Sequence, residues 1–192
     1  RCDWSSDVCS SDLLNFSKAF SVLLVFTLFG FGIVKASQNA LPNNLLYPVK
    51  LATEKIQLDS QKDEATRLNL RVKFAQNRIK EVKILETQEI DNLEYIKDAV
   101  LKYQNEINNI QEELNKIVSK NKDEGTLESL IVLENELNNS LKEIDNLTSS
   151  SSLETANLLN YAKESASSTL ANISSNILEY EKSTLKVNSD PL

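Results

Sequence analysis

The sequence predicts an all-α protein: a long helical coiled coil or an antiparallel helical bundle, behind an N-terminal apolar signal or anchor helix. Three observations predict this class. The 192 residues contain only three Gly and three Pro, too few for the turns of a sandwich, a barrel or a doubly wound sheet. Apolar residues recur with a helical period over most of the chain, and one uncharged segment lies near the N-terminus.

Residues 1–13 are expected to be an artefact and not part of the fold. They read RCDWSSDVCSSDL and have neither helical nor strand periodicity. The stretch from Asp3 to Leu13 resembles the in-frame translation of a common sequencing-library adapter, and such segments are set aside before fold reasoning. Both cysteines, Cys2 and Cys9, lie here, so the cysteine count says nothing about the redox compartment. We therefore expect the natural start to lie upstream of Leu14.

Residues 14–36 are predicted to be a signal peptide or a membrane anchor. Residues 19–34, between Lys18 and Lys35, carry no charge. As a helix they span about 24 Å, which is short for a hydrocarbon core of about 30 Å and typical of a signal peptide. Val34 and Ala36 then predict cleavage before Ser37. The alternative is a retained anchor that contacts the membrane through residues 19–34, and both place the rest of the chain outside the cytoplasmic membrane.

Residues 37–59 are predicted to form a turn and a short helix. Pro42 and the two Asn after it favour a turn. Pro48 suits the first turn of a helix, where its missing N–H costs nothing. Ser60 is expected to cap the helix that follows.

Residues 60–119 are predicted to form one continuous heptad-patterned helix. Alternating steps of three and four give sixteen seam positions, fourteen of them apolar or aromatic, which is typical of a coiled coil: Ala65, Leu68, Val72, Ala75, Ile79, Val82, Glu86, Glu89, Leu93, Ile96, Val100, Tyr103, Ile107, Ile110, Leu114 and Ile117. The alternative splits this stretch at residues 86–91 into two helices of a compact bundle, which Leu85 and Ile90, just off register, allow.

The remaining chain is expected to fold back along this helix in two segments. Residues 120–125 form a turn, residues 126–147 a helix capped by Thr126, residues 148–151 a serine-rich joint, residues 152–186 a helix and residues 187–192 a tail. Ser151 with Glu154 fits a capping box. Apolar positions mark the core faces of the two helices: Leu127, Leu130, Leu137, Leu141, Ile144, Ala156, Leu159, Ala166, Leu170, Ile173, Ile177 and Tyr180.

No catalytic, cofactor-binding or metal-binding residues are predicted. The chain has no His, no Cys after Cys9 and no glycine-rich loop, so it lacks the residues of catalytic triads, thiol nucleophiles, common metal sites and phosphate cradles. Its paired carboxylates are expected on solvated helix faces. The net charge of −7 argues against a nucleic-acid partner. We therefore expect no enzyme, no cofactor and no small-molecule substrate.

Two groups of charged residues near the seam allow a functional and a structural interpretation. Glu86 and Glu89 mark either a hinge or docking notch, or a local rotation that seats Leu85 and Ile90 instead. The second group consists of Arg67, Arg71 and Arg78. In the functional interpretation they bind a partner that carries carboxylates or an anionic polymer of the cell envelope. In the structural interpretation they form salt bridges with Glu on a facing helix. In both cases the structural interpretation is favoured.

Residues 40–85 are similar to the bacterial family of domains of unknown function numbered 5667. Two elements carry the resemblance: Leu41-Pro42 followed by Leu46-Tyr47-Pro48-Val49-Lys50, and then Asn77-Arg78-Ile79-Lys80-Glu81. Asn43 stands where that family usually has Gly, which loosens the turn. The resemblance implies an extracytoplasmic helical module, in which Tyr47-Pro48 docks the chain onto the helix pair. Some relatives resemble the outer portions of anti-sigma-factor-type membrane proteins.

These observations predict an exported coiled-coil protein that acts by protein–protein contact, self-association through helices, or contact with the cell envelope. The alternative function is that of a membrane-tethered sensory or regulatory ectodomain. The sequence does not distinguish a secreted or periplasmic location from anchoring to the cytoplasmic membrane, and it does not identify the partner.

Overall fold

The computed structural model describes residues 32–88, 92–120 and 124–187, and these residues are helical apart from short turns. The five long helices are α2 (Tyr47–Ser60), α3 (Glu64–Glu86), α4 (Leu93–Lys120), α5 (Glu124–Ser150) and α6 (Leu153–Val187). The prediction of an all-α protein is confirmed. Residues 32–37 are also helical, whereas the rest of the predicted signal or anchor segment and the adapter-like residues lie outside the described residues. None of the described helices combines the length and apolarity of a membrane span.

The described chain divides into two compact units. One holds the residues up to Ala40 together with Asn44–Thr53, and the other holds Leu41–Asn43 and the chain from Glu54 onward. Helix α2 therefore contributes its first half to one unit and its second half to the other. The larger unit contains the four helices α3 to α6.

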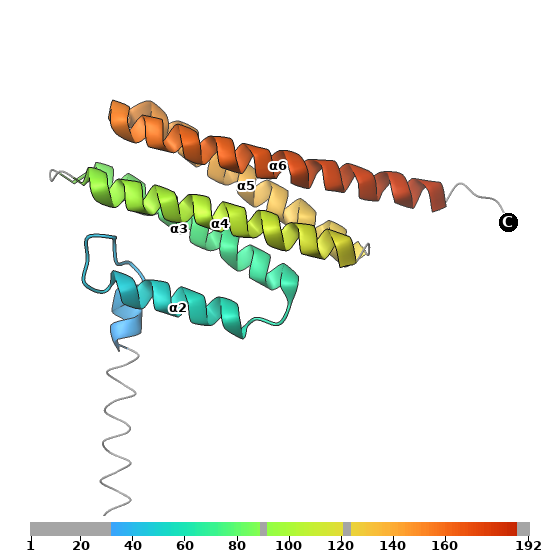
Figure 1. Ribbon diagram of the computed structural model, residues 1–192, viewed down its shortest axis with the longest axis horizontal. Helices are drawn as coiled ribbons and strands as arrows, with labels where there is room; N and C mark the ends of the chain where they lie inside the picture. Colours follow the sequence, from blue (N-terminus) through green and yellow to red (C-terminus); the bar gives the residue numbers. More distant parts are fainter. Residues whose placement is uncertain (1–31, 89–91, 121–123, 188–192) are drawn as a thin grey trace, which may run out of the picture. The chain divides into compact units, whose positions relative to one another are not determined.

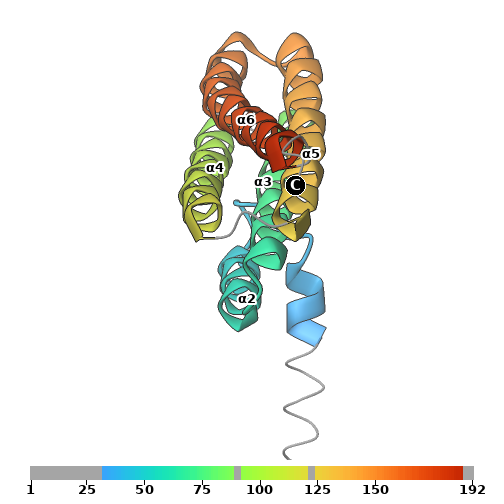
Figure 2. The same ribbon diagram turned by 90° about the vertical axis from the view of Figure 1, so that its right-hand side faces the viewer.

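Helices α3 to α6 form a four-helix bundle made of two antiparallel hairpins, α3–α4 and α5–α6 (Figures 1 and 2). Helix α3 packs against α4 and α5, and α6 packs against the same two helices. Helices α4 and α5, although consecutive, therefore face each other across the core. This arrangement stacks the second hairpin on the first, with α3 and α5 running in one direction and α4 and α6 in the other (Figure 1).

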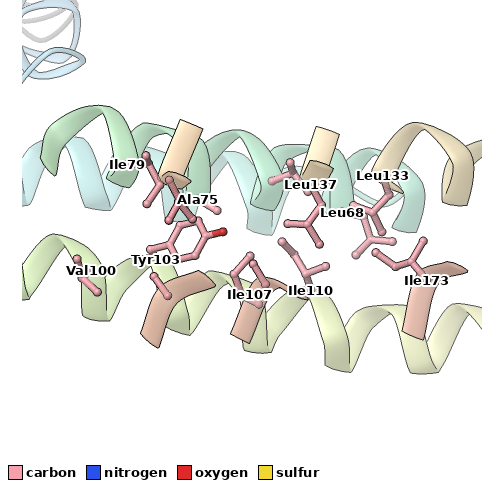
Figure 3. Packing of buried hydrophobic residues seen from close by; sticks show 14 of the residues in the cluster. Leu68, Ala75, Ile79, Val100, Tyr103, Ile107, Ile110, Leu133, Leu137 and Ile173 are labelled. Carbon is pink, nitrogen blue, oxygen red and sulfur yellow. The ribbon is translucent and has the colours of Figure 1, made fainter. Parts of the chain in front are cut away.

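The core is a single cluster of mainly aliphatic side chains from all four helices, together with Tyr103 and Tyr180 (Figure 3). Most of the predicted seam positions of α3 and α4 belong to it, and so do the predicted core positions Leu130, Leu137, Ile144, Leu159, Ala166 and Ile173. Burial of this apolar surface is the main force that holds such a bundle together, because each helix alone is only marginally stable in water.

The prediction of one continuous helix over residues 60–119 is wrong. Helix α3 ends at Glu86, Thr87 takes the C-cap position, and α4 begins at Leu93 and returns along α3. The heptad phase is the same before and after the break because Val82 and Leu93 are 11 residues apart, which equals steps of four, three and four. Leu85, off that register, is fully buried, as the two-helix alternative allowed. Glu86 is half-buried, and Glu89 and Ile90 lie outside the described residues.

Helix α3 buries residues on two faces, which the heptad pattern did not show. Its seam faces α4 and the core, and a second row consists of Phe74, Arg78, Glu81 and Leu85. The spacing of four, three and four residues keeps this row on one side of the helix. Glu54 on the second half of α2 forms an ion pair with Arg78 of this row, and Leu58, one turn further along α2, is buried. The second row of α3 thus contacts α2.

Three of the predicted helix caps are corrected. Helix α3 is capped by Asp63 and not by Ser60. Helix α5 begins at Glu124, so Thr126 lies inside its first turn. At α6 the hydroxyl of Ser152, and not that of Ser151, accepts a hydrogen bond from the N–H of Thr155 (3.3 Å). Each error is one to three residues, because several neighbouring polar side chains at these ends have equal capping ability.

Replacing the N-cap of α3 by Asp63→Ala is expected to cost about 1 kcal/mol at neutral pH. The Asp63 carboxylate accepts hydrogen bonds from the N–H and the hydroxyl of Thr66 (2.8 and 2.5 Å), and these bonds lower its pKa. A carboxyl group whose pKa is lowered by folding stabilises the fold at pH values above its ordinary pKa. This stabilisation is lost as the pH falls. Urea unfolding at pH 7 and pH 2.5 measures the loss. Asp59→Ala, on the exposed end of α2, is the control, and equal losses for the two variants would contradict the capping role.

The largest buried polar side chain of the core is Tyr103 on α4. Its ring lies against Ala75 and Ile79 of α3 (Figure 3), and its hydroxyl is 3.4 Å from that of Ser140 on α5. Burial raises the pKa of Tyr103 to about 12. The hydrogen-bond partner Ser140 carries no charge, and burial in the core keeps the phenol of Tyr103 protonated.

Raising the pH from 9 to 11 is expected to cost about 1 kcal/mol through Tyr103 alone. The unfolded chain ionises this phenol near pH 10, whereas the folded chain keeps the proton up to about pH 12. The protonated Tyr103 therefore makes its full contribution to the free energy of unfolding below pH 10. This contribution decreases as the pH rises to 12. Urea unfolding of the wild type and of Tyr103→Phe at both pH values isolates the effect. An identical alkaline loss in the two proteins would argue against it.

Candidate functional site

The family-like residues at the start of α2 form a clamp on the preceding segment. The Lys50 ammonium group donates a hydrogen bond to the carbonyl oxygen of Ala40 (3.1 Å) and lies 5.9 Å from the centre of the Tyr47 ring. Lys50 and Tyr47 are both buried. A buried ammonium group needs such fixed partners. The motif thus closes a ten-residue loop, with Pro48 exposed in the first turn of α2.

The turn before α2 depends on Asn44. Its side-chain oxygen accepts a hydrogen bond from the N–H of Leu46 (2.8 Å), and its carbonyl accepts one from the N–H of Tyr47 (3.0 Å). Asparagine favours such turns because its side chain replaces a backbone partner. Leu46 is half-buried, whereas Leu45 is almost fully exposed.

Leu41, Pro42 and Asn43 belong to the larger unit. Leu41 packs against the bundle core, and Pro42 is half-buried. Asn43 donates a hydrogen bond to the side-chain oxygen of Gln88 after α3 (3.3 Å). Asn43 therefore has a bonding role that the Gly expected at this position lacks.

Arg78 and Glu81, the second family-like element, lie in a buried ion-pair triad with Glu54. The Arg78 guanidinium donates to both oxygens of Glu81 (2.8 and 3.1 Å) and to Glu54 of α2. The Arg78 side chain is 2% exposed and that of Glu81 4%. The planar guanidinium suits two carboxylates because it presents several donors in one plane. The triad therefore joins α2 to α3 through fully engaged charges.

Arg67 and Arg71 form a second network between α3 and α4. Arg67 pairs with Glu113 (2.8 Å) and Arg71 with Glu106 (3.0 Å). The Nε atom of Arg71 also lies 2.9 Å from Glu113, without the alignment of a hydrogen bond. Burial lowers the pKa of Arg71, but Glu113 and Glu106 outweigh burial and raise it. The arginines thus form the interhelical salt bridges that the structural interpretation expected.

The surface of the bundle carries shallow clefts. One, of about 250 Å³, lies between the start of α3 and the end of α4, and a second, of about 500 Å³, also reaches the start of α5. A third, of about 200 Å³, lies at the opposite end beside Asn92 and Ser152. In the described ranges no group of three or more Asp, Glu, His or Cys side chains is arranged to hold a metal ion. The carboxylate of Glu113, which lines the first cleft, is held by Arg67 and Arg71.

The structure gives the family-like residues other than the exposed Pro48 a place in packing. It brings Arg78 and Glu81 together, and separately Tyr47 and Lys50. The sequence analysis missed Glu54, which connects α2 to Arg78. One signal for it was present, since Glu54 follows Lys50 by one helical turn on the face of α2 that also holds Tyr47 and Leu58.

Comparison with known proteins identifies one family. No curated protein and no solved structure matches the chain. A family model described as Domain of unknown function (DUF5667) matches residues 39–152, which cover the Lys50 clamp, both arginine networks and helices α2 to α5. The match spans more than half of the 192 residues, and the chain therefore belongs to the DUF5667 family.

Proposed function

We propose that this chain is an exported helical-bundle protein that acts by contact with a protein or with the cell envelope, without a catalytic role. The observation that carries the proposal is that the buried charged side chains are bound to partners inside the fold. Arg78, Glu81 and Lys50 are each held by fixed partners inside the fold. The core between the helices is filled by apolar side chains and the rings of Tyr103 and Tyr180. The groups that remain accessible to another molecule therefore lie on the outer helix faces.

Export is proposed for two reasons. Residues 19–34 carry no charge, and Val34 and Ala36 precede Ser37 as at the cleavage site of a signal peptide. The alternative, a membrane-tethered sensory ectodomain of the anti-sigma-factor-like kind, differs only in whether this segment is retained. Intact-mass analysis of membrane and exported fractions from a bacterial host separates the two. A start at Ser37 in the soluble exported fraction supports the free protein, and an uncleaved chain confined to the membrane supports the tethered one. Recovery of the uncleaved chain from the cytoplasm would contradict both.

A further inference from the structure

The third cleft, of about 200 Å³, lies at the end of the bundle where α3 meets α4 and α5 meets α6, on the left in Figure 1. We call it the Asn92 cleft. Part of its lining is apolar, since Leu85 and Ile96 are buried and Leu93 is half-buried. The rest consists of side chains that can accept hydrogen bonds: Glu86, Gln88, Asn92, Ser152, Glu154 and Thr155. Among the described residues that line it there is no Lys and no Arg.

The side chain of Asn92 keeps an unpaired acceptor, although the residue is only 4% exposed. Its Nδ2 group donates hydrogen bonds to the carbonyl oxygen of Leu85 and to the side-chain oxygen of Gln88 (both 3.2 Å). These acceptors fix the orientation of the amide, because exchanging its N and O atoms would place two oxygens against each other. The buried Oδ1 atom accepts no hydrogen bond from any described residue. A buried acceptor is costly without a donor, so this position favours a ligand that brings one.

Glu86 gives the same cleft a negative charge. Its side chain is half-buried, and its carboxylate accepts one long hydrogen bond, from the hydroxyl of Ser152 (3.4 Å). No described residue forms an ion pair with it, whereas Glu81 and Glu113 are both paired with arginines. A charged donor binds a carboxylate more strongly than a neutral one does. The donor that the cleft favours is therefore a cation.

We propose that the Asn92 cleft binds the side-chain ammonium group of a lysine on a partner protein. This inference rests on the proposed contact function and names the group that the partner presents. An ammonium group has three donors and no acceptor, which suits the Oδ1 atom of Asn92 and the carboxylate of Glu86. Its four-carbon stem is apolar and suits Leu85, Leu93 and Ile96. A lysine side chain therefore uses both the charged and the apolar part of the lining.

Other cations use less of this lining. A hard metal ion such as Ca²⁺ takes about six to eight oxygen ligands, and it leaves the apolar residues of the cleft without a role. Within the described ranges no group of three or more Asp, Glu, His or Cys side chains is arranged to hold a metal ion. The ethanolamine headgroup of a lipid carries an ammonium group but only a two-carbon stem. Both are outcomes that the experiment distinguishes from lysine.

Titration of the ¹⁵N-labelled full chain with Nα-acetyl-lysine amide, followed by NMR at pH 7, measures this binding. A maltoside detergent holds the chain in solution, because it carries no ammonium group. One lysine makes few contacts, so we expect a dissociation constant of about 1–10 mM. The largest shifts are expected at the side-chain amide of Asn92 and the N–H groups of Leu93 and Thr155. Nα-acetyl-norleucine amide, which has the same stem without the ammonium group, and ethanolamine are expected to bind at least about fivefold more weakly.

Two matched variants test the role of the charge. Glu86→Gln keeps the size of the side chain and an acceptor but removes the charge, and it is expected to weaken the binding of lysine amide by about fivefold. Glu128→Gln, at an exposed glutamate near the start of α5, makes the same change in net charge and is expected to leave binding unchanged.

Four results would overturn the proposal. They are equal binding of the norleucine or ethanolamine probe, equal effects of the two Gln variants, no shifts around Asn92, and the same shifts with millimolar Ca²⁺ in place of lysine amide. A chain that is exported but does not bind lysine amide leaves the proposed function standing.

Discussion

Ending the chain after Ser152 is expected to abolish cooperative unfolding. The shortened chain retains the whole segment that matches the family but loses α6, which packs against both α4 and α5. Helix α6 contributes buried apolar residues between Leu159 and Tyr180: Leu159, Ala162, Ala166, Ile173, Ile177 and Tyr180. Without it, one side of the core is exposed to water, and the remaining helices lose the burial that stabilises them. We expect a molten state with helical circular dichroism but no sharp thermal transition.

Thermal melts followed by circular dichroism, together with dye binding to exposed apolar surface, measure this effect. A chain ending after Lys182 is the control, because it keeps every buried residue of α6 through Tyr180, and it is expected to melt like the full chain. A sharp transition of the chain ending after Ser152, within a few degrees of the full-length one, would show that α6 is dispensable and that the family segment is a complete domain.

Replacing Arg78 by Met is expected to destabilise the fold by about 3–5 kcal/mol, because it leaves Glu54 and Glu81 buried without their shared cation. Both carboxylates are largely buried, with side-chain exposures of 14% and 4%. Arg67→Met, which removes a salt bridge of an arginine that is 34% exposed, is the control and is expected to cost no more than about 1 kcal/mol. Urea unfolding at pH 7 gives both values.

A third variant separates the loss of the cation from the loss of packing. The combination of Glu54→Leu, Arg78→Met and Glu81→Leu removes all three charges together, and such replacements are often neutral or stabilising. It is therefore expected to recover most of the stability that Arg78→Met loses. If the triple variant is as unstable as Arg78→Met, the triad acts through its shape and not through its charges.

The helical class and the core positions were predictable because burial requires a periodic pattern. The seam residues from Leu68 to Val82 and from Ile96 to Ile117 are buried as their spacing indicated. The spacing did not reveal the break after Glu86, since α4 begins seven residues later, at Leu93, and this connection leaves the heptad count unchanged. Leu85, Thr87 and Asn92 were the local signals. Leu85 is buried off register, Thr87 caps α3, and Asn92 bonds back to the carbonyl of Leu85 (3.2 Å).

The buried charges were less predictable than the core. Arg78 and Glu81 were singled out by the family resemblance, but their burial depends on the second half of α2, from Glu54 onward, contacting the second row of α3. That face carries Phe74 and Leu85 together with two charged residues, so it has no apolar period. Glu54 lies on the same face of α2 as Lys50 and Leu58, which indicates that its side chain points inward. No local pattern identifies its partner, because the contact with Arg78 joins residues that are far apart in the sequence.

Helices α3 and α4 form a hairpin inside a bundle and not one long coiled-coil helix. Spin labels at Asn69→Cys on α3 and Glu112→Cys on α4, both exposed, test it directly in the full chain with Cys2→Ser and Cys9→Ser. The bundle predicts a separation of about 20 Å or less, because neighbouring helix axes are about 10 Å apart. A continuous helix between the two positions would give about 65 Å, and that result would contradict the account.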